Sequence, residues 1–179
     1  MSDNEQRGQF ERLVMPHLDA AYNLARWLAG NDHDAKDIAQ EACMRAFRFV
    51  GGCRGSDGRA WVLTIVRNTA YSWLKKNRAQ PLVSIDDDEF PEIEDQSAAA
   101  RPFHSADMDI LRAALEALPL EFREALVLRE LEGLSYKEIA EVAEVPVGTV
   151  MSRLARARGL LQRSPVLQAI GDQSSGGGR

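Results

Sequence analysis

The fold is constrained most by the segment that begins at Ser135, SYKEIAEVAEVPVGTVMSRLARARGLLQR. Ser135 and Glu138 have the spacing of a capping box, in which the two side chains accept hydrogen bonds from each other's backbone N–H groups. Pro146 suits the start of a second helix, because an N–H at that place would have no intrahelical acceptor. Ala140 and Val150 supply the small and apolar contact that two crossing helices need. The segment therefore predicts a helix-turn-helix.

Charge changes abruptly within this segment, after Glu144. Acids recur up to that residue, and beyond it the segment has no acid but four arginines, Arg153, Arg156, Arg158 and Arg163. Helical spacing predicts that the second helix buries four apolar side chains, Val150, Leu154, Ala157 and Leu161. The opposite face would then carry three polar residues, Ser152, Arg153 and Arg156. Such an acid-free helix can enter the major groove of DNA, and its first-turn N–H groups can hold a backbone phosphate.

Apolar residues recur at helical spacing through most of the remaining chain, so we expect an all-α protein. A first helix would turn inward Val14, Leu18, Ala21, Ala25 and Leu28, and a second Ile38, Ala42, Ala46 and Phe49. A third, from about 60 to 77, would use Val62, Ile65, Val66, Thr69, Ala70 and Trp73. Helical spacing resumes at Met108, Leu111, Leu115 and Leu118, and again from Phe122 through Leu126 to Leu131. Gly133 would end that last helix.

This spacing divides the chain into two small helical domains joined by an acidic flexible linker. The first domain covers residues 1–78 and the second, which ends in the helix-turn-helix, covers residues 106–165. The linker, residues 79–105, has seven acids against Arg101 and no sustained period, and a glycine- and serine-rich tail follows at 166–179.

The overall charge hides a pattern. The net charge of −5 argues against a nucleic-acid partner, yet residues 45–78 hold eight Lys or Arg against one acid, Asp57. Within this region AWVLTIVRNTAYSWLKKNR mixes aromatic rings with cations, a combination that grips single-stranded nucleic acid by stacking and phosphate contacts. The alternative, equally open on the sequence, is that Trp61 and Trp73 are core residues.

Other functions find little support in the sequence. No apolar run approaches the length of a membrane span and the amino terminus is polar, so we expect a cytoplasmic protein without membrane insertion. Cys43 and Cys53 lack metal-ligand spacing, and His17, His33 and His104 are scattered. We therefore expect no metal, no cofactor, reduced thiols and no catalytic residues, that is, not an enzyme.

Three stretches together resemble a known family. DAKDIAQEACMRAF at 34–47, AWVLTIVRNTAYSWLKKNR at 60–78 and ALPLEFREALVLRELEGLSYKEIAEVAEVPVGTVMSRLARAR at 117–158 are similar to the extracytoplasmic-function (group IV) sigma factors of bacterial RNA polymerase. The resemblance implies a sigma factor that binds core polymerase, recognises the −35 and −10 promoter elements and assists melting to initiate transcription. It also implies an inhibitory anti-sigma protein that clamps the two domains together.

Positions that match the family's motifs give three sets of expected site residues. Contacts to the clamp helices of the core polymerase would come from Asp37, Gln40 and Glu41, which share one polar face at helical spacing. The −10 element would be bound by Arg54, Gly55, Ser56, Arg59, Trp61, Arg67, Asn68, Tyr71 and Lys75. The −35 element would be bound by Val147, Gly148, Thr149, Met151, Ser152, Arg153, Arg156 and Arg158. By the same resemblance the acidic linker would run through the polymerase toward the path of the transcript.

Two residues depart from the family pattern. Met151 stands where lysine or arginine is frequent, and Glu144 stands where glycine is common at the turn; a left-handed backbone at Glu144 would cost about 1 kcal/mol.

Two other hypotheses about the function remain open on the sequence. One is a stand-alone helix-turn-helix transcriptional regulator, which would dimerise or sense a ligand. The other is a helical module that binds only proteins, against which the two basic regions argue.

Overall fold

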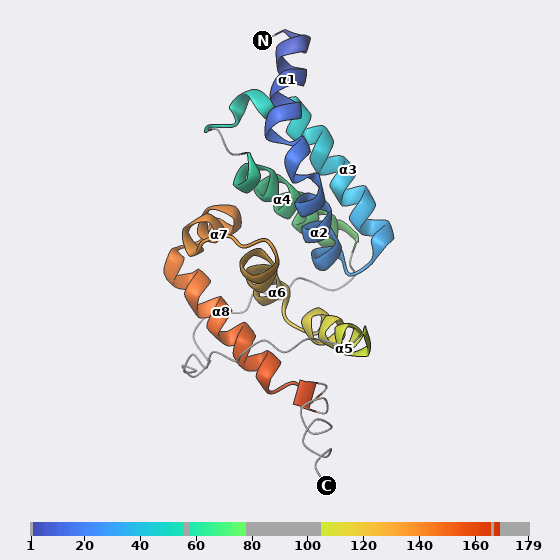
Figure 1. The fold of residues 1–179 in the computed structure, drawn as a ribbon, viewed down its shortest axis with the longest axis vertical. Helices are drawn as coiled ribbons and strands as arrows, with labels where there is room; N and C mark the ends of the chain where they lie inside the picture. The colour runs from blue at the N-terminus through green and yellow to red at the C-terminus, as the bar shows by residue number, and fades with distance from the viewer. Residues whose placement is uncertain (1, 56–57, 78–104, 166, 169–179) are drawn as a thin grey trace.

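The computed structural model describes residues 2–55, 58–77, 105–165 and 167–168, and every regular element in those ranges is a helix. Figure 1 shows the helices of the first domain, α1 to α4, stacked above α6, α7 and α8 of the second. The linker predicted at 79–105 and the tail at 166–179 lie almost wholly outside the described residues.

The first domain contains α1 (Asp3–Leu13), α2 (Leu18–Ala29), α3 (Asp32–Phe49) and α4 (Arg59–Asn77). The spacing that begins at Val14 predicts a single helix, but a 3₁₀ turn at Met15–His17 separates α1 from α2 because Pro16 falls there. Asn31 caps α3 by accepting a hydrogen bond from the N–H of Asp34 at 2.9 Å. Helix α1 was not predicted, although Ser2 and Glu5 form a capping box at its start.

The second domain contains α5 (Ser105–Glu116), α6 (Leu120–Leu126), a π-helical turn η3 (Val127–Leu131), α7 (Tyr136–Ala143) and α8 (Val147–Gln162). The predicted capping box is confirmed: the N–H of Ser135 donates to Glu138 at 2.7 Å, and the N–H of Glu138 donates to the Ser135 hydroxyl at 3.2 Å. Pro146 is the N-cap of α8, so the predicted helix-turn-helix is formed by α7 and α8.

Most of the predicted inward residues are buried or half-buried, and three predictions are wrong. Phe49 is 58% exposed, Met108 is 52% exposed and Leu131 is 55% exposed. Each lies at one end of its run of spaced residues, where few neighbouring elements remain to cover a side chain. Trp61 and Trp73 are half-buried and pack against the core, which favours the structural role for both rings.

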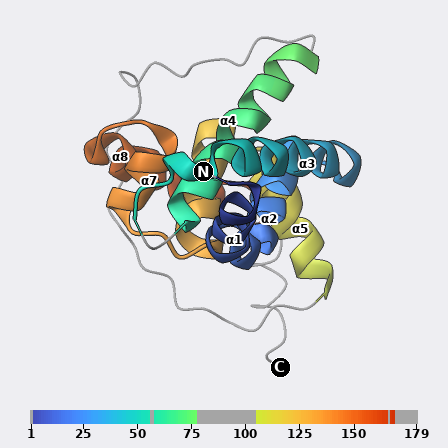
Figure 2. The ribbon, with the colours of Figure 1, turned by 90° about the horizontal axis from the view of Figure 1, so that it is seen from above.

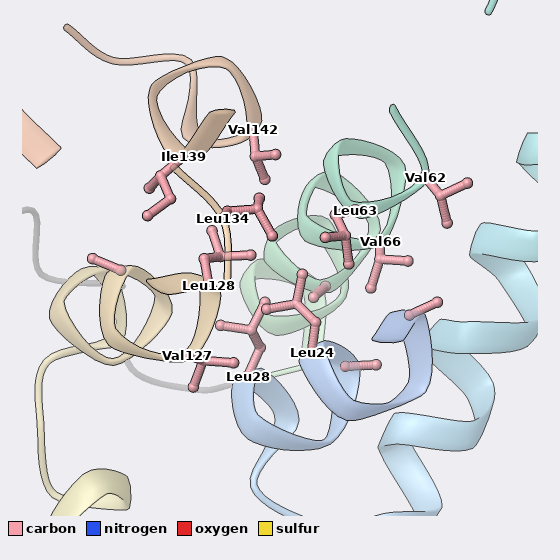
Figure 3. Close-up of a cluster of buried hydrophobic side chains, with 14 of the residues drawn as sticks. Leu24, Leu28, Val62, Leu63, Val66, Val127, Leu128, Leu134, Ile139 and Val142 are labelled. Carbon is pink, nitrogen blue, oxygen red and sulfur yellow. The ribbon is translucent and has the colours of Figure 1, made fainter. Parts of the chain in front are cut away.

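One hydrophobic core spans both domains. Figure 3 shows Leu24 and Leu28 of α2 beside Val127 and Leu128 of η3, with Leu63 of α4 near Leu134. Seen from above in Figure 2, α7 and α8 lie to one side of α4 and α3 crosses on the other. Helix α4 packs against α7, and α2 packs against α6. The two domains therefore share a buried interface in this conformation.

Candidate nucleic-acid interface

Helix α8 presents a mixed surface. The first-turn residues Val147 and Gly148 are exposed, as is Met151, whereas Ser152 and Arg156 are half-buried. The sequence predicts that Arg153 points away from the protein, and this is wrong: its side chain is 12% exposed and lies 3.4 Å from a carboxylate oxygen of Glu121 on α6. The α6 carboxylate attracts the guanidinium inward, a pairing that helical spacing within α8 cannot reveal.

A polar cluster joins α4 to the second domain. The Nε of Arg67 donates to one carboxylate oxygen of Glu124 at 2.7 Å, and the hydroxyl of Tyr71 donates to the other at 2.8 Å. The Arg67 guanidinium also lies 4.0 Å from the centre of the Tyr71 ring and 3.4 Å from the side-chain oxygen of Asn68. Three predicted −10 residues therefore lie together, and two of them, Arg67 and Tyr71, are bonded to Glu124 of the second domain.

Burial sets the electrostatics of this cluster. Glu124 is 1% exposed, and removal from water raises the pKa of its carboxyl while the positive charge and hydrogen bond of Arg67 oppose that rise. Burial also raises the pKa of the Tyr71 phenol, and the negative charge of Glu124 adds to the effect. The tyrosine thus remains a hydrogen-bond donor at every physiological pH.

The start of α4 is tied to the second domain in the same way. A guanidinium nitrogen of Arg59 lies 3.6 Å from Glu132, whose side chain is 8% exposed. Burial raises the pKa of Glu132, against the effect of Arg59. At the far end of α4, Lys75 is exposed, and the predicted −10 residues are therefore divided between the domain interface and solvent.

Two glycines, Gly55 and Gly58, allow the backbone conformation of the loop before α4. Arg54 and Gly55 are exposed, and Gly55 has a φ of +107°, a conformation that side chains disfavour. Gly58 is buried, and a Cβ there would collide with the carbonyl oxygen of Leu13. Ser56, the other predicted −10 residue of this loop, lies outside the described residues.

The predicted polymerase contacts line one groove. Asp37, Gln40 and Glu41 lie on the wall formed by α3, in a groove of about 450 Å³. The sequence did not indicate its other lining residues, which are Met44, Arg45, Thr69, Ser72, Trp73 and Lys76. Glu41 accepts a hydrogen bond from Arg45 at 2.7 Å, and the Nε2 of His33 lies 3.8 Å from a carboxylate oxygen of Asp37.

The sequence did not indicate which acids pair with the arginines of the candidate interface. Glu121, Glu124, Glu130 and Glu132 all come from the segment LEFREALVLRELE. Its four glutamates signal a charged surface, yet nothing in the local spacing says that two of them face the other domain. In the part of the chain that the structure describes, no group of three or more His, Cys, Asp or Glu is placed to hold a metal ion.

The fold and this interface define a two-domain helical protein whose second domain is a helix-turn-helix. Comparison with known proteins agrees in both domains. Residues 13–80 match the family model "Sigma-70 region 2", and residues 108–161 match "Sigma-70, region 4".

Two individual proteins are similar to this chain across both domains. The RNA polymerase sigma-H factor of Pseudomonas aeruginosa is 35% identical over 171 residues, which are 89% of each chain. The ECF RNA polymerase sigma factor SigE of Mycolicibacterium smegmatis is 36% identical over 155 residues, 83% of this chain and 58% of the relative's length. The chain belongs to the extracytoplasmic-function sigma factors of bacterial RNA polymerase. The stand-alone regulator is not favoured, because the first domain matches a sigma region.

A solved structure supports the same assignment. The sigma factor RpoE of Bartonella quintana, crystallised with the anti-sigma factor NepR, aligns with a TM-score of 0.67 and 31% identity over 87% of this chain and 94% of that one. Among the described residues, no helix is long and apolar enough to cross a membrane.

Proposed function

We propose that this transcription initiation factor binds core RNA polymerase through the α3 groove, reads the −35 element with α8, and binds the −10 element with α4 and the loop before it. The observation that carries the proposal is that one chain holds both sigma regions, with the predicted contact residues on α3, on α4 with the loop before it, and on α8. It acts without catalytic residues of its own, in the cytoplasm, where core polymerase and promoter DNA are its partners.

Core binding follows from the chemistry of the groove. Asp37 and Gln40 offer oxygen acceptors beside the apolar surface of Met44 and Trp73. A helical partner with arginines at matching spacing would place guanidinium groups on the acceptors and its aliphatic stems on the apolar wall. The clamp helices of the core are the proposed partner.

The protein would bind the −35 element as duplex DNA and the −10 element as single-stranded DNA. The exposed first turn of α8 offers backbone N–H groups to a phosphate, and Ser152 and Arg156 reach toward base edges from the turn that follows. Asn68 can donate to and accept from the edge of an unstacked base, while Arg54 and Lys75 contact its backbone. We also propose an anti-sigma partner, because the similar RpoE was crystallised with one.

Run-off transcription with core polymerase tests this function. Core polymerase is supplied with a library of promoter fragments, with and without the full chain, and new discrete start sites are expected only when the chain is present. Asp37→Lys should abolish them by repelling the arginines of the core. Glu11→Lys, which reverses an exposed acid near the end of α1, is the matched control and should retain them.

Two outcomes would contradict the proposal. If no start site depends on the chain, the sigma function fails. If Asp37→Lys initiates as well as Glu11→Lys does, the groove is not the core-binding surface. Binding of fluorescent chain to core polymerase, measured in parallel, separates loss of core binding from loss of promoter binding.

A further inference from the structure

Two arginines of α8 lie on opposite flanks of the stripe that this helix buries. The stripe is made of Val150, Leu154 and Ala157, none of which is more than 1% exposed. At about 100° per residue, Arg153 lies about 60° to one side of Val150 and Arg158 about 80° to the other. Neither arginine is therefore at the centre of the face that α8 turns away from the protein.

Each flanking arginine binds a glutamate from the segment that comes before α7. A guanidinium nitrogen of Arg153 lies 3.4 Å from a carboxylate oxygen of Glu121 on α6. A guanidinium nitrogen of Arg158 donates to Glu130 of η3 at 2.9 Å. Both pairs stay within the second domain, where α8 packs against α6 and α7 (Figure 1). The pairs therefore tie α8 to the same neighbouring segment on both sides of its buried stripe.

The two pairs differ in their exposure to water. The side chains of Arg153 and Glu121 are 12% and 24% exposed, whereas those of Arg158 and Glu130 are 34% and 57% exposed. An exposed pair contributes little, because water and salt screen its charges. A pair held away from water is stronger, and the loss of one member leaves the other charge without its counter-ion. The Glu121–Arg153 pair therefore constrains α8 more than the Glu130–Arg158 pair does.

Apolar packing alone fixes the rotation of α8 about its axis only weakly. Hydrophobic burial has no preferred direction, and the buried stripe is narrow. A rotation of about 20° moves the tip of a side chain, about 5 Å from the axis, by about 2 Å, which breaks a hydrogen bond. Ser152 and Arg156 lie about 160° and 120° from Val150, on the outward side. Their reach toward base edges therefore depends on what fixes the rotation.

The Arg153 guanidinium cannot serve Glu121 and a promoter phosphate together. Both anions present oxygen acceptors to the same nitrogen donors, so a phosphate would have to displace the carboxylate. Glu121 belongs to the same domain and stays beside Arg153 whether or not DNA is bound. The structure thus directs this arginine toward α6.

We propose that Glu121 and Arg153 are a positioning pair, which fixes the rotation of α8 about its axis and so determines which promoter bases its outward residues reach. Neither member of the pair touches DNA. The Glu130–Arg158 pair supports the opposite flank more weakly. The inference rests on the proposed −35 role of α8, and it replaces the expectation that Arg153 contacts the promoter.

A neutral substitution separates positioning from direct contact. The full chain with core polymerase is titrated with a promoter fragment found by run-off transcription and with the same fragment carrying a scrambled −35 element. The ratio of the two affinities is the discrimination. Glu121→Gln leaves Arg153 without its counter-ion, so the discrimination should fall about tenfold, as for the loss of one base contact.

A direct contact predicts a different result for the same variant. Release of Arg153 to a phosphate would make the dependence of log affinity on log salt steeper by about 0.9 and keep the discrimination. Unchanged discrimination overturns the proposal, whether or not the slope changes. Asp109→Asn, which removes an exposed acid of α5 in the same domain, is the matched control and should alter neither quantity.

A charge swap then tests the pair as a unit. Arg153→Glu and Glu121→Arg each set like charges side by side and should each lower the discrimination. The double variant should return it to within about threefold of the wild type, because the pair is restored in reverse. A glutamate cannot replace an arginine that holds a phosphate, so a swap without recovery overturns the positioning pair. Arg156→Glu with Glu121→Arg carries the same charges on the outward side of α8 and should not recover.

Folding and the proposed function are checked separately. Circular dichroism compares the helix content of each variant with that of the wild type, and Glu121→Gln, which changes the shape least, keeps the test valid if a charge reversal unfolds the domain. A wild type that binds both fragments equally overturns the −35 role of α8 and the positioning role with it. A wild type that discriminates, beside a swap that does not recover, overturns the positioning pair alone.

Discussion

Glu144 is the residue at which the chain departs most from local preference. It ends α7 with φ 57° and ψ 45°, the only described residue other than glycine with a positive φ. Its N–H still donates to the carbonyl of Ala140, so the turn of the helix-turn-helix is formed despite the strain. The backbone at Glu144 is therefore left-handed, at the position where the sequence departs from the family pattern.

Replacing this residue should stabilise the protein. Glu144→Gly relieves a left-handed conformation that costs about 1 kcal/mol for a residue with a Cβ. The free energy of unfolding, measured by urea denaturation, should rise by about that amount. Glu141→Gly is the matched control, because this exposed glutamate lies inside α7, where glycine should lower the same free energy by about 1 kcal/mol. A loss at Glu144 equal to that at Glu141 would contradict the strain.

Helix α8 is the element on which specificity depends, and its exposed face is less positive than its composition suggests. Arg153 and Arg158 pair with acids of the second domain, and Met151, near the start of α8, is 54% exposed. The methionine leaves one position on this face without a cation. The element therefore has room for a stronger phosphate contact.

We expect Met151→Arg to strengthen duplex binding. One added phosphate contact should make the dependence of log affinity on log salt steeper by about 0.9. The full chain with core polymerase, titrated with promoter fragments at several salt concentrations, gives this slope. Met15→Arg adds the same charge at a methionine that is 50% exposed in the first domain, and it should leave the slope unchanged. Equal slopes for the two variants would place Met151 away from DNA.

At the scale of the whole molecule, the two domains share one hydrophobic core, so we expect them to unfold as one unit. Leu128 of η3 is fully buried among residues of both domains, as Figure 3 shows. All three tryptophans, Trp27, Trp61 and Trp73, belong to the first domain. Tryptophan fluorescence therefore reports the first domain, and helix content reports both.

Leu128→Ala should destabilise both domains together. The cavity and lost burial should cost about 2–5 kcal/mol, and the fluorescence and circular dichroism transitions should move to lower denaturant and still coincide. Leu131→Ala, at a leucine of the same turn that is 55% exposed, should change little. A shift in circular dichroism that leaves the tryptophan transition in place would show that the domains unfold independently.

The sequence by itself determined the helices of the core other than α1, the capping box at Ser135 and the turn at Glu144. These features depend on periodicity and on contacts between residues three or four apart, which a linear chain displays directly. It also determined the family, through motifs in both domains.

Only the tertiary structure decided which arginine pairs with which glutamate. The pairing of Arg67 with Glu124 joins positions 57 residues apart in sequence, and Arg153 turns toward Glu121 from another helix. The same holds for the shared core and for the exposure of Phe49, since burial depends on which element arrives from elsewhere in the chain. Contacts between distant residues carry no local signal, so the closed arrangement of the two domains could be seen only in three dimensions.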